Sequence, residues 1–423
     1  MAVQVCFLLS WALFCSTAML LAIFLKHRKG CGKSDRKLPP GEMGLPWIGE
    51  TADFYRSQRG NQLFEEFVQP RVTKYGKIFK TRLLGSPTII VNGAEANRFF
   101  LSNEFKLVIS SWPTTSVQLM GINSIMEKQG EQHRFLREII ATSLGPAGLE
   151  ILVPKICDSV QLYLDRNWNV RDEISLFHSA KALTFTIVLE CLLGLNFEPG
   201  TLSTFERVLE GVFAAPVSFP GSKLSRAKKA RREIKEMLIK VVREKRKEME
   251  SGLVGDERML FTRFVSGMIR GDISEEEVID NVVLLVFAAH DTTSFAIAMT
   301  FKMLAEHPDC HSLLLQDLDS SCLLQILWTT YGTHYNEEYF RDPLTFNPRR
   351  FEEPIPPYAY LPFGGGPRIC AGNQLAKLNI LIFIHYVVTR YNWSLLCPDE
   401  QITTDPLPFP SHGMPIKVSL KSS

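Results

Sequence analysis

A glycine-rich loop that ends in a cysteine and leads into an apolar helix constrains this 423-residue chain more strongly than any other stretch. The loop spans residues 363–372, and an apolar run follows it at residues 375–388. Three successive glycines, Gly364 to Gly366, permit tight turns and a close approach to a large planar ligand. Cys370 stands just before the predicted helix, where the helix dipole and the nearby Arg368 favour a thiolate over a thiol.

Cys370 is therefore a candidate metal ligand, because a thiolate is a soft donor. One cysteine alone cannot build a zinc site, which needs three or four protein ligands. A single thiolate is, by contrast, sufficient to hold haem iron from one side. The alternative is a buried structural cysteine beside a turn, which is the commoner role of a cysteine taken at random.

The residues around Cys370 resemble the haem-binding signature of the cytochrome P450 family. All five fixed positions of that signature are matched, by Phe363, Gly366, Arg368, Cys370 and Gly372. The resemblance implies a mainly α fold with small β-sheets. It also implies haem b (iron protoporphyrin IX) as the cofactor, with Cys370 as the axial ligand of its iron, Arg368 on a haem propionate and Phe363 shielding the thiolate.

A second polar cluster lies inside a long apolar helix. Ser274 and Glu277 form a predicted capping box, and residues 278–306 are apolar on all sides, so this helix is expected to run through the core. Polar residues in such a helix are costly and need partners, which makes Asp291 and Thr292 functional candidates. We expect the Thr292 hydroxyl to bond to the carbonyl of Ala288 and to loosen the helix there.

This cluster resembles the oxygen-activation motif of the same family. The matching positions are Ala288, Asp291, Thr292 and Thr293, while Ala289 replaces the usual glycine. The resemblance implies that Thr292 hydrogen-bonds during oxygen activation, that Asp291 helps to relay protons and that Ala288 borders the substrate. We interpret His290 as a packing residue, because its side chain points away from the Thr292 face. The alternative is a satisfied polar pocket within a core helix.

The helix predicted from residue 130 onward carries several basic residues. The family often has a tryptophan four residues before a basic residue that binds a haem propionate. Here Gly130 takes the place of that tryptophan, with Arg134 four residues later and His133 beside it. His133, Arg134 and Arg137 all stay open as propionate ligands, and the alternative is a solvated basic helix face.

The N-terminus predicts a membrane anchor. Residues 3–25 are almost wholly apolar and long enough to cross a bilayer, and a basic run follows at residues 26–29. A cleaved signal would need positive charge before the apolar run, where this chain has none. The predicted organisation is an anchor at residues 1–25, a basic and proline-rich hinge at residues 26–50 and a catalytic domain at residues 51–423. The flanking charge places this domain in the cytosol, and the membrane is expected to be the endoplasmic reticulum.

Composition restricts the remaining possibilities. The net charge is +2, which gives no reason to expect a nucleic-acid partner. The basic start of the helix predicted at residues 222–250 is interleaved with glutamates further on, which indicates a solvated helix. Nine scattered cysteines without a Cys-x-x-Cys pair indicate reduced thiols and not a disulfide framework.

Periodicity predicts the other elements. Short strands are expected at residues 78–84 and 88–91, and helices at residues 94–101, 149–168, 174–193 and 202–215. Residues 112–121 have no clean periodicity and are predicted to form a loop, which the resemblance would place along the substrate pocket. The resemblance also makes Phe409, in a proline-rich turn, an apolar contact of the substrate.

The resemblance fails at one place. Only 78 positions separate Thr292 from Cys370, too few for the helices and the Glu-x-x-Arg motif that the family has there. Glu338 to Arg341 has the right letters, but Pro343 follows it closely and favours a loop. Arg350, in the Pro-x-Arg-Phe element, would then lack its family partners. We expect an internal deletion near residues 317–326, from splicing or from an error in the gene prediction.

By resemblance, the intact enzyme is a monooxygenase that hydroxylates a hydrophobic small molecule of the sterol, triterpenoid or diterpenoid class. It would use O2 and electrons from NADPH–cytochrome P450 reductase. One alternative is an oxygen-independent member that rearranges hydroperoxides, but such members lose the acid–threonine pair. Another is a catalytically inactive membrane-anchored variant, which the missing segment favours.

Overall fold

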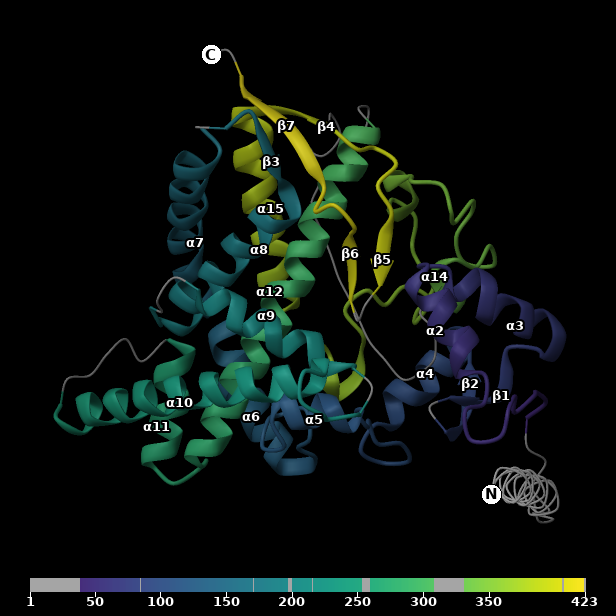
Figure 1. Cartoon of the computed structure of the whole chain (residues 1–423), viewed down its shortest axis with the longest axis horizontal. Coiled ribbons are helices and arrows are strands. Elements are labelled where there is room, and N and C mark those ends of the chain that lie inside the picture. Colours follow the sequence, from purple (N-terminus) through teal and green to yellow (C-terminus); the bar gives the residue numbers. More distant parts are fainter. Residues whose placement is uncertain are drawn as a thin grey trace, which may run out of the picture.

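The computed structural model describes residues 39–83, 85–169, 171–196, 200–214, 216–252, 259–307, 331–404 and 407–421. These residues form a mainly helical body with small antiparallel sheets (Figure 1). The α-helices are α2 (Thr51–Arg59), α3 (Gln69–Tyr75), α4 (Ala94–Asn103), α5 (Thr114–Met120), α6 (Gly130–Leu144), α7 (Pro146–Asn167), α8 (Leu176–Thr186), α9 (Thr201–Val212), α10 (Lys223–Glu250), α11 (Leu260–Ile269), α12 (Glu275–Glu306), α14 (Tyr331–His334) and α15 (Asn373–Arg390). The strands are β1 (Ile78–Leu83), β2 (Ser86–Val91), β3 (Glu173–Ser175), β4 (Tyr391–Leu395), β5 (Ile402–Thr404), β6 (Pro408–Pro410) and β7 (Pro415–Leu420).

Helix α12 runs through the centre of the body, as its apolar sequence predicts. Its N-terminus has the expected capping box, in which Ser274 and Glu277 exchange hydrogen bonds. Its C-terminal half packs beside α15, where the rings of Phe301 and Phe383 lie 5.5 Å apart, edge to face (Figure 1). Both phenylalanines are fully buried in the main core. The helix that follows the cysteine loop is therefore anchored directly on the central helix.

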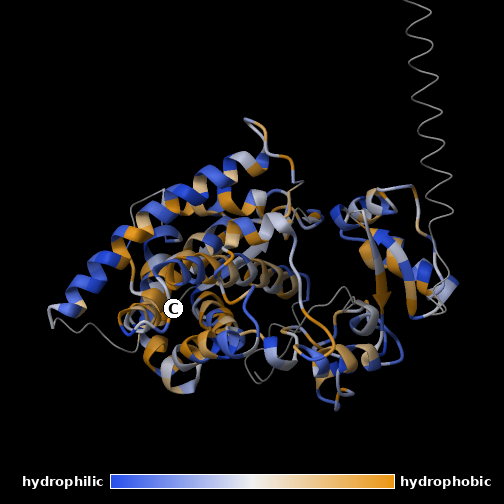
Figure 2. Cartoon of the chain, turned by 90° about the horizontal axis from the view of Figure 1, so that it is seen from below, coloured by the Kyte–Doolittle hydropathy of each residue, from blue (hydrophilic) through white to orange (hydrophobic). Residues whose placement is uncertain are grey.

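The sheets are small and lie at the edges of the helical body. Strands β1 and β2 form an antiparallel hairpin with Ile78 opposite Val91, so the two predicted strands are confirmed. Strand β7 pairs with both β3 and β4, and β5 pairs with β6. In Figure 2 the β1–β2 hairpin stands beside the main helical mass, where it packs on its own small core around Phe67 and Phe79.

Two local predictions were wrong. Residues 112–121 are not a loop, because Thr114–Met120 form helix α5, which begins after Pro113 and ends at Gly121 with φ +105°. The hydroxyls of Thr115 and Ser116 both donate to the carbonyl of Val212 at the end of α9. Tertiary hydrogen bonds thus stabilise a helix that its short sequence does not predict.

The second error concerns residues 174–193, which were predicted as a single helix. The chain instead forms β3, then α8, and ends in a π-helical stretch at Ile187–Leu193. Pairing of Ile174 with Ile416 of β7 draws the first residues into the sheet. A partner strand from the far end of the sequence therefore overrides the local helical pattern.

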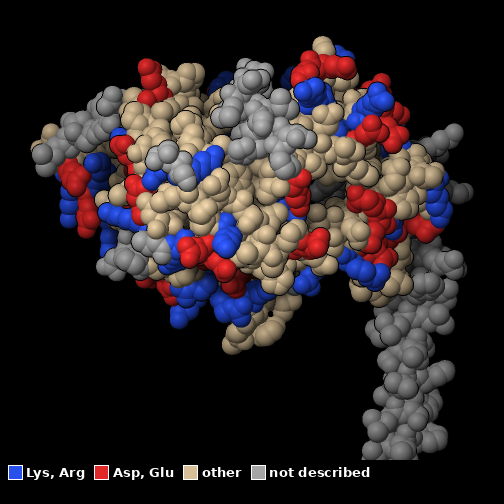
Figure 3. Space-filling model, turned by 90° about the horizontal axis from the view of Figure 1, so that it is seen from above, with Lys and Arg blue, Asp and Glu red and all other residues tan. Residues whose placement is uncertain are grey.

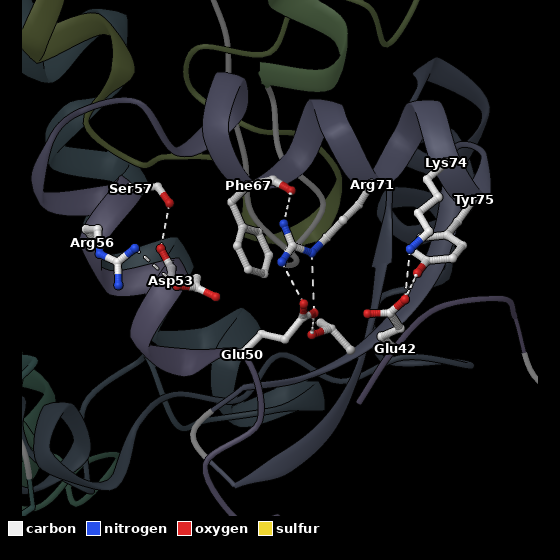
Figure 4. A network of polar contacts seen from close by, with 10 residues as sticks. Glu42, Glu50, Asp53, Arg56, Ser57, Phe67, Arg71, Lys74 and Tyr75 are labelled. Atoms are coloured by element: carbon white, nitrogen blue, oxygen red, sulfur yellow. Dashed lines mark hydrogen bonds and ion pairs between the residues drawn. The ribbon is translucent and has the colours of Figure 1, made fainter. Parts of the chain in front are cut away.

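The described part of the predicted hinge, residues 39–50, is fixed to the hairpin and to α3. The Lys80 amide donates to the Pro40 carbonyl, and the Glu50 amide donates to the Arg82 carbonyl. Figure 4 shows the side-chain contacts, in which Arg71 pairs with Glu50 at 2.6 Å. This stretch is thus part of the folded body, whereas the predicted anchor at residues 1–25 lies outside the described residues.

Two described helical stretches are apolar and long enough to cross a membrane, namely Leu176–Leu193 and Glu275–Glu306. Both contribute to the main hydrophobic core, through residues such as Leu183 and Phe301. Packing inside the protein thus covers half or more of the most apolar window of each stretch.

Helix α10 lies on the outside of the body, as its charged sequence predicts. Figure 2 shows hydrophilic and hydrophobic residues alternating along it, and the hydrophobic ones, such as Ile234 and Leu238, are buried. Exposed side chains of α10 form ion pairs with α12, for example Arg243 with Glu275 at 3.0 Å. Basic and acidic side chains are likewise interleaved on the face shown in Figure 3.

Candidate functional site

The cysteine loop has the tight turns that its glycines predict. Gly364 and Gly366 both have positive φ, at +73° and +66°. A Cβ atom on Gly366 would lie 2.4 Å from the Leu101 carbonyl oxygen at the end of α4, so this position accepts only glycine. The Cys370 amide then donates to the Phe363 carbonyl at 3.3 Å, and α15 begins at Asn373. Cys370 thus lies just ahead of a helix N-terminus and is partly exposed, as expected for a thiolate ligand.

Arg368 is held firmly within the protein. Its guanidinium forms an ion pair with Glu104 at 2.8 Å and donates to the carbonyls of Met126 and Lys128 at 3.2 and 2.9 Å. It also lies over the Phe105 ring, 4.8 Å from the centroid. The side chains of Arg368 and Glu104 are only 12% and 9% exposed. The orientation of Arg368 is therefore fixed by partners far away in the sequence.

The three basic candidates on helix α6 do not all lie on the same face of the helix. His133 is buried with its ring 5.1 Å from that of Phe105, and burial lowers its pKa to about 4, helped by the positive charges of Arg368 and Arg137. Burial also lowers the pKa of Arg137, while the negative charge of the Cys370 thiolate opposes that shift. His133 and Arg137 thus lie beside the cysteine loop.

Arg134 lies outside this cluster. It is exposed and pairs with Glu131, one turn earlier on the same helix, at 2.7 Å. The sequence left His133, Arg134 and Arg137 open as propionate ligands, and Arg137 lies four residues after His133. A step of four along a helix keeps the same face, and the buried His133 marks that face. Burial of His133 thus selects Arg137 over Arg134 as the cation beside Cys370.

The polar cluster of α12 has the predicted local geometry. The Thr292 hydroxyl donates to the Ala288 carbonyl at 2.7 Å. Ala288 and Thr292 are exposed, whereas Thr293 and Ser294 on the opposite side are buried. A central helix that exposes one narrow strip, with a small methyl and a hydroxyl on it, leaves room for a ligand at that strip.

Asp291 has a partner that the sequence did not reveal. Lys181 of α8 forms an ion pair with it at 3.0 Å and a second one with Glu206 of α9 at 3.2 Å. Burial lowers the pKa of Lys181, but the two carboxylates outweigh burial and hold that pKa above its ordinary value. Lys181 therefore stays charged and links Asp291 to the edge of the protein at Glu206.

The other candidates have less distinctive surroundings. His290 is buried with its ring centroid 5.6 Å from that of Phe185, which confirms it as a packing residue. Phe409 lies in β6 and is partly buried against the main core. Within the described ranges, no group of three or more His, Cys, Asp and Glu side chains could hold a metal ion.

Arg350, whose family partners belong to the missing motif, bonds to residues close to it in the sequence. Arg350 donates to the carbonyls of Asn347 and Asp342 at 3.1 and 2.9 Å, and also to that of Thr345. Glu338 pairs with Lys77, and Arg341 is exposed, so the Glu338–Arg341 stretch forms turns and not a motif helix, as predicted. The expected join near residues 317–326 lies outside the described residues.

A partly exposed thiolate, a cluster of cations beside it and an acid–alcohol pair on a central helix define a haem-thiolate protein with a mainly α fold. The chain belongs to the cytochrome P450 family, whose sequence profile matches residues 39–322 and 324–419. It is accordingly an oxidoreductase of the monooxygenase type with a haem cofactor.

Curated proteins similar to this chain include plant hydroxylases. The chain is 30% identical to the taxane 13-alpha-hydroxylase of Taxus cuspidata, with 97% of each chain covered. It is 32% identical to the taxoid 2-alpha-hydroxylase of Taxus canadensis, with 92% of each covered. Among solved structures, a cyanobacterial cytochrome P450 with bound retinoic acid is 26% identical and superimposes with a TM-score of 0.78, over 91% of this chain and 99% of that one.

Proposed function

We propose that this protein hydroxylates a terpenoid-type hydrophobic molecule, of the sterol, triterpenoid or diterpenoid class, with O2 and electrons from NADPH–cytochrome P450 reductase. The observation that carries this proposal is the exposed strip of Ala288 and Thr292 on α12, the helix against which α15 packs behind the Cys370 loop. Similarity to hydroxylases of taxanes, and to the protopanaxadiol 6-hydroxylase of Panax ginseng at 31% identity, supports the substrate class.

The residues of the site fit haem. Cys370 supplies the single thiolate, and Gly366 packs closely on the Leu101 backbone, as in a loop whose backbone approaches a planar ligand. Arg368, and the Arg137 side chain beside Cys370, provide positive charge for carboxylate groups. When bound, haem supplies the oxygen-activating chemistry, which a thiolate ligand favours.

The remaining residues would orient the substrate and deliver protons. Thr292 keeps its hydroxyl on the exposed strip because its hydrogen bond to Ala288 fixes the rotamer. Asp291, Lys181 and Glu206 form a chain of ionisable groups between that strip and the edge of the protein. Asp291 would help to relay protons to the Thr292 hydroxyl, and the charged Lys181 would hold the Asp291 carboxylate in place. Ala288 and Phe409 would contact the apolar substrate.

Residues 1–25 would anchor the enzyme in the endoplasmic reticulum membrane as a single span, with the catalytic domain in the cytosol. The apolar run followed at once by basic residues supports this topology. The hydrogen bonds between residues 39–50 and β1 would fix the catalytic domain close to that anchor.

A second candidate function is a catalytically inactive variant with an internal deletion. Arg350 supports it, because within the described residues this arginine contacts only carbonyls of its own loop. The family profile breaks at residue 323. The alignment to the taxane 13-alpha-hydroxylase has 474 positions and covers 97% of this chain, about 410 residues, so about 64 positions have no residue here.

One experiment separates the two candidates. The full chain is expressed in microsomes, reduced and exposed to carbon monoxide. The red-shifted Soret band of a thiolate-ligated haem, followed by NADPH-dependent hydroxylation of terpenoid scaffolds with added reductase, would support the first candidate. An unshifted band, or no haem, would support the inactive variant. Sequencing the transcript across residues 316–326 then shows whether the deletion occurs in the message.

A further inference from the structure

The connection between α5 and α6, residues 121–129, is attached to one face of α12. Three side chains of α12 reach it from neighbouring turns: Glu277, Asp280 and Asn281. The Asp280 carboxylate accepts from the backbone amide and the side-chain amide of Asn123, both at 3.1 Å. The Asn281 side chain accepts from the Ile125 amide at 2.9 Å. Residues spaced by three and four lie on one helix face, so α12 presents a row of acceptors to this connection.

Arg231 of α10 completes the contacts at the start of the connection. It donates to the Leu119 carbonyl at 2.9 Å and pairs with Asp280 at 2.5 Å. The side chains of Arg231 and Asp280 are 10% and 7% exposed. Gly121 lies so close that a Cβ on it would be 2.1 Å from the Asp280 Cγ. The carboxylate of Asp280 thus joins α10, α12 and the end of α5 at a single buried point.

The other end of the connection holds the arginine of the cysteine loop. Arg368 donates to the carbonyls of Met126 and Lys128, and Lys128 pairs with Glu277 at 2.8 Å. Met126 directly follows Ile125, whose amide is held by Asn281. The two carbonyls that orient Arg368 are therefore carried by a backbone that α12 fixes.

We propose that Asp280 and Asn281 are positioning residues for the haem edge: through residues 121–129 they set the orientation of Arg368, and with it the retention of haem. This inference rests on the proposed function. Asp280 lies eleven residues before Asp291, about 16 Å along the helix, so it does not touch the reacting atoms. Its effect passes through the connection.

The test compares the loss of the buried α10–α12 ion pair with the loss of an exposed one. The double variant Arg231→Met/Asp280→Asn removes the buried pair and leaves neither charge unpartnered, whereas Asp280→Asn alone would strand a buried cation. The control is Glu275→Gln, which breaks the exposed pair with Arg243 between the same two helices. Haem dissociation into excess apomyoglobin, the carbon monoxide spectrum and amide hydrogen exchange of residues 121–129 are measured on the full chain.

In the double variant we expect haem to dissociate about 10- to 100-fold faster, the range typical of outer-shell partners of a metal site. The amides of Asn123 and Ile125 should exchange faster, and Glu275→Gln should change neither quantity. Unchanged haem dissociation, even with faster exchange, would overturn the positioning role. If the parent chain binds no haem, the proposed function fails, and exchange in the haem-free chain still decides whether Asp280 holds the connection.

Discussion

Two arginines, Arg368 in the cysteine loop and Arg350 earlier in the sequence, are held in opposite ways. Arg368 is buried, pairs with Glu104 and bonds to carbonyls more than 200 residues away in sequence. Arg350 is partly exposed and bonds only to carbonyls within eight residues of itself, as far as the described chain shows. The cysteine loop is thus braced by distant parts of the fold, while the loop of Arg350 is braced by itself.

The difference has an energetic meaning. A buried ion pair strongly resists removal of one partner, because the remaining charge is left without compensation. Hydrogen bonds from a partly exposed arginine to nearby carbonyls are readily replaced by water. The site is therefore expected to depend on contacts such as Glu104–Arg368 far more than on Arg350.

The largest effect is expected from the thiolate itself. Cys370→Ser should abolish the red-shifted Soret band of the reduced carbon monoxide complex, because a serine hydroxyl does not replace a thiolate ligand of haem iron. The control is Cys397→Ser, which alters an exposed cysteine. A red-shifted band that survives in Cys370→Ser would contradict the assigned ligand.

The second-largest effect is expected from breaking the long-range ion pair between Glu104 and Arg368. Glu104→Gln should destabilise the protein by about 3–5 kcal/mol, because it leaves Arg368 as a buried charge without its carboxylate. Urea unfolding followed by tryptophan fluorescence measures the free energy of unfolding. Glu131→Gln, which breaks the exposed pair with Arg134, is the matched control and should cost less than about 1 kcal/mol. An equal loss of unfolding free energy in the two variants would contradict the stronger role given to the long-range ion pair.

A smaller, pH-dependent effect on the free energy of unfolding is expected from His334, which holds the backbone just before the cysteine loop. Its Nε2 accepts from the Leu361 amide at 2.8 Å, and burial lowers its pKa to about 4. The unfolded chain therefore binds a proton more readily, and the free energy of unfolding falls by about 2–3 kcal/mol as the pH drops from about 6.5 to 4. His334→Gln should flatten this part of the profile of unfolding free energy against pH. If the free energy of unfolding depends on pH with the same slope in His334→Gln as in the exposed control His385→Gln, the role of His334 is contradicted.

The smallest effect is expected at Arg350. Arg350→Met should change the free energy of unfolding by about 1 kcal/mol or less, since its carbonyl partners regain water. The same urea titration measures it beside Glu104→Gln. A loss as large as that of Glu104→Gln would mean that Arg350 has a buried carboxylate partner.

Local chemistry made much of this structure predictable. The capping box at Ser274, the hydrogen bond from Thr292 to Ala288 and the buried course of α12 all follow from residues within one or two turns. The glycines of the cysteine loop likewise predicted its backbone, since only glycine fits at Gly366.

What the sequence did not predict depends on contacts between distant segments. Helix α5 is stabilised by the Val212 carbonyl, 96 and 97 residues away from the two hydroxyls that donate to it. Lys181 was not recognised as the partner of Asp291, because the two residues lie on different helices. The side of α6 that faces Cys370 was also ambiguous until burial distinguished Arg137 from Arg134.

The contact between Gly121 and Asp280 restricts how this enzyme can be altered. Any side chain at position 121 would meet the Asp280 carboxylate in addition to the backbone strain at φ +105°. Libraries that randomise the neighbourhood of α5 to change substrate preference should therefore leave position 121 as glycine, or vary positions 121, 231 and 280 together. Val117 and Gln118, one turn earlier on α5, are the safer positions for diversification.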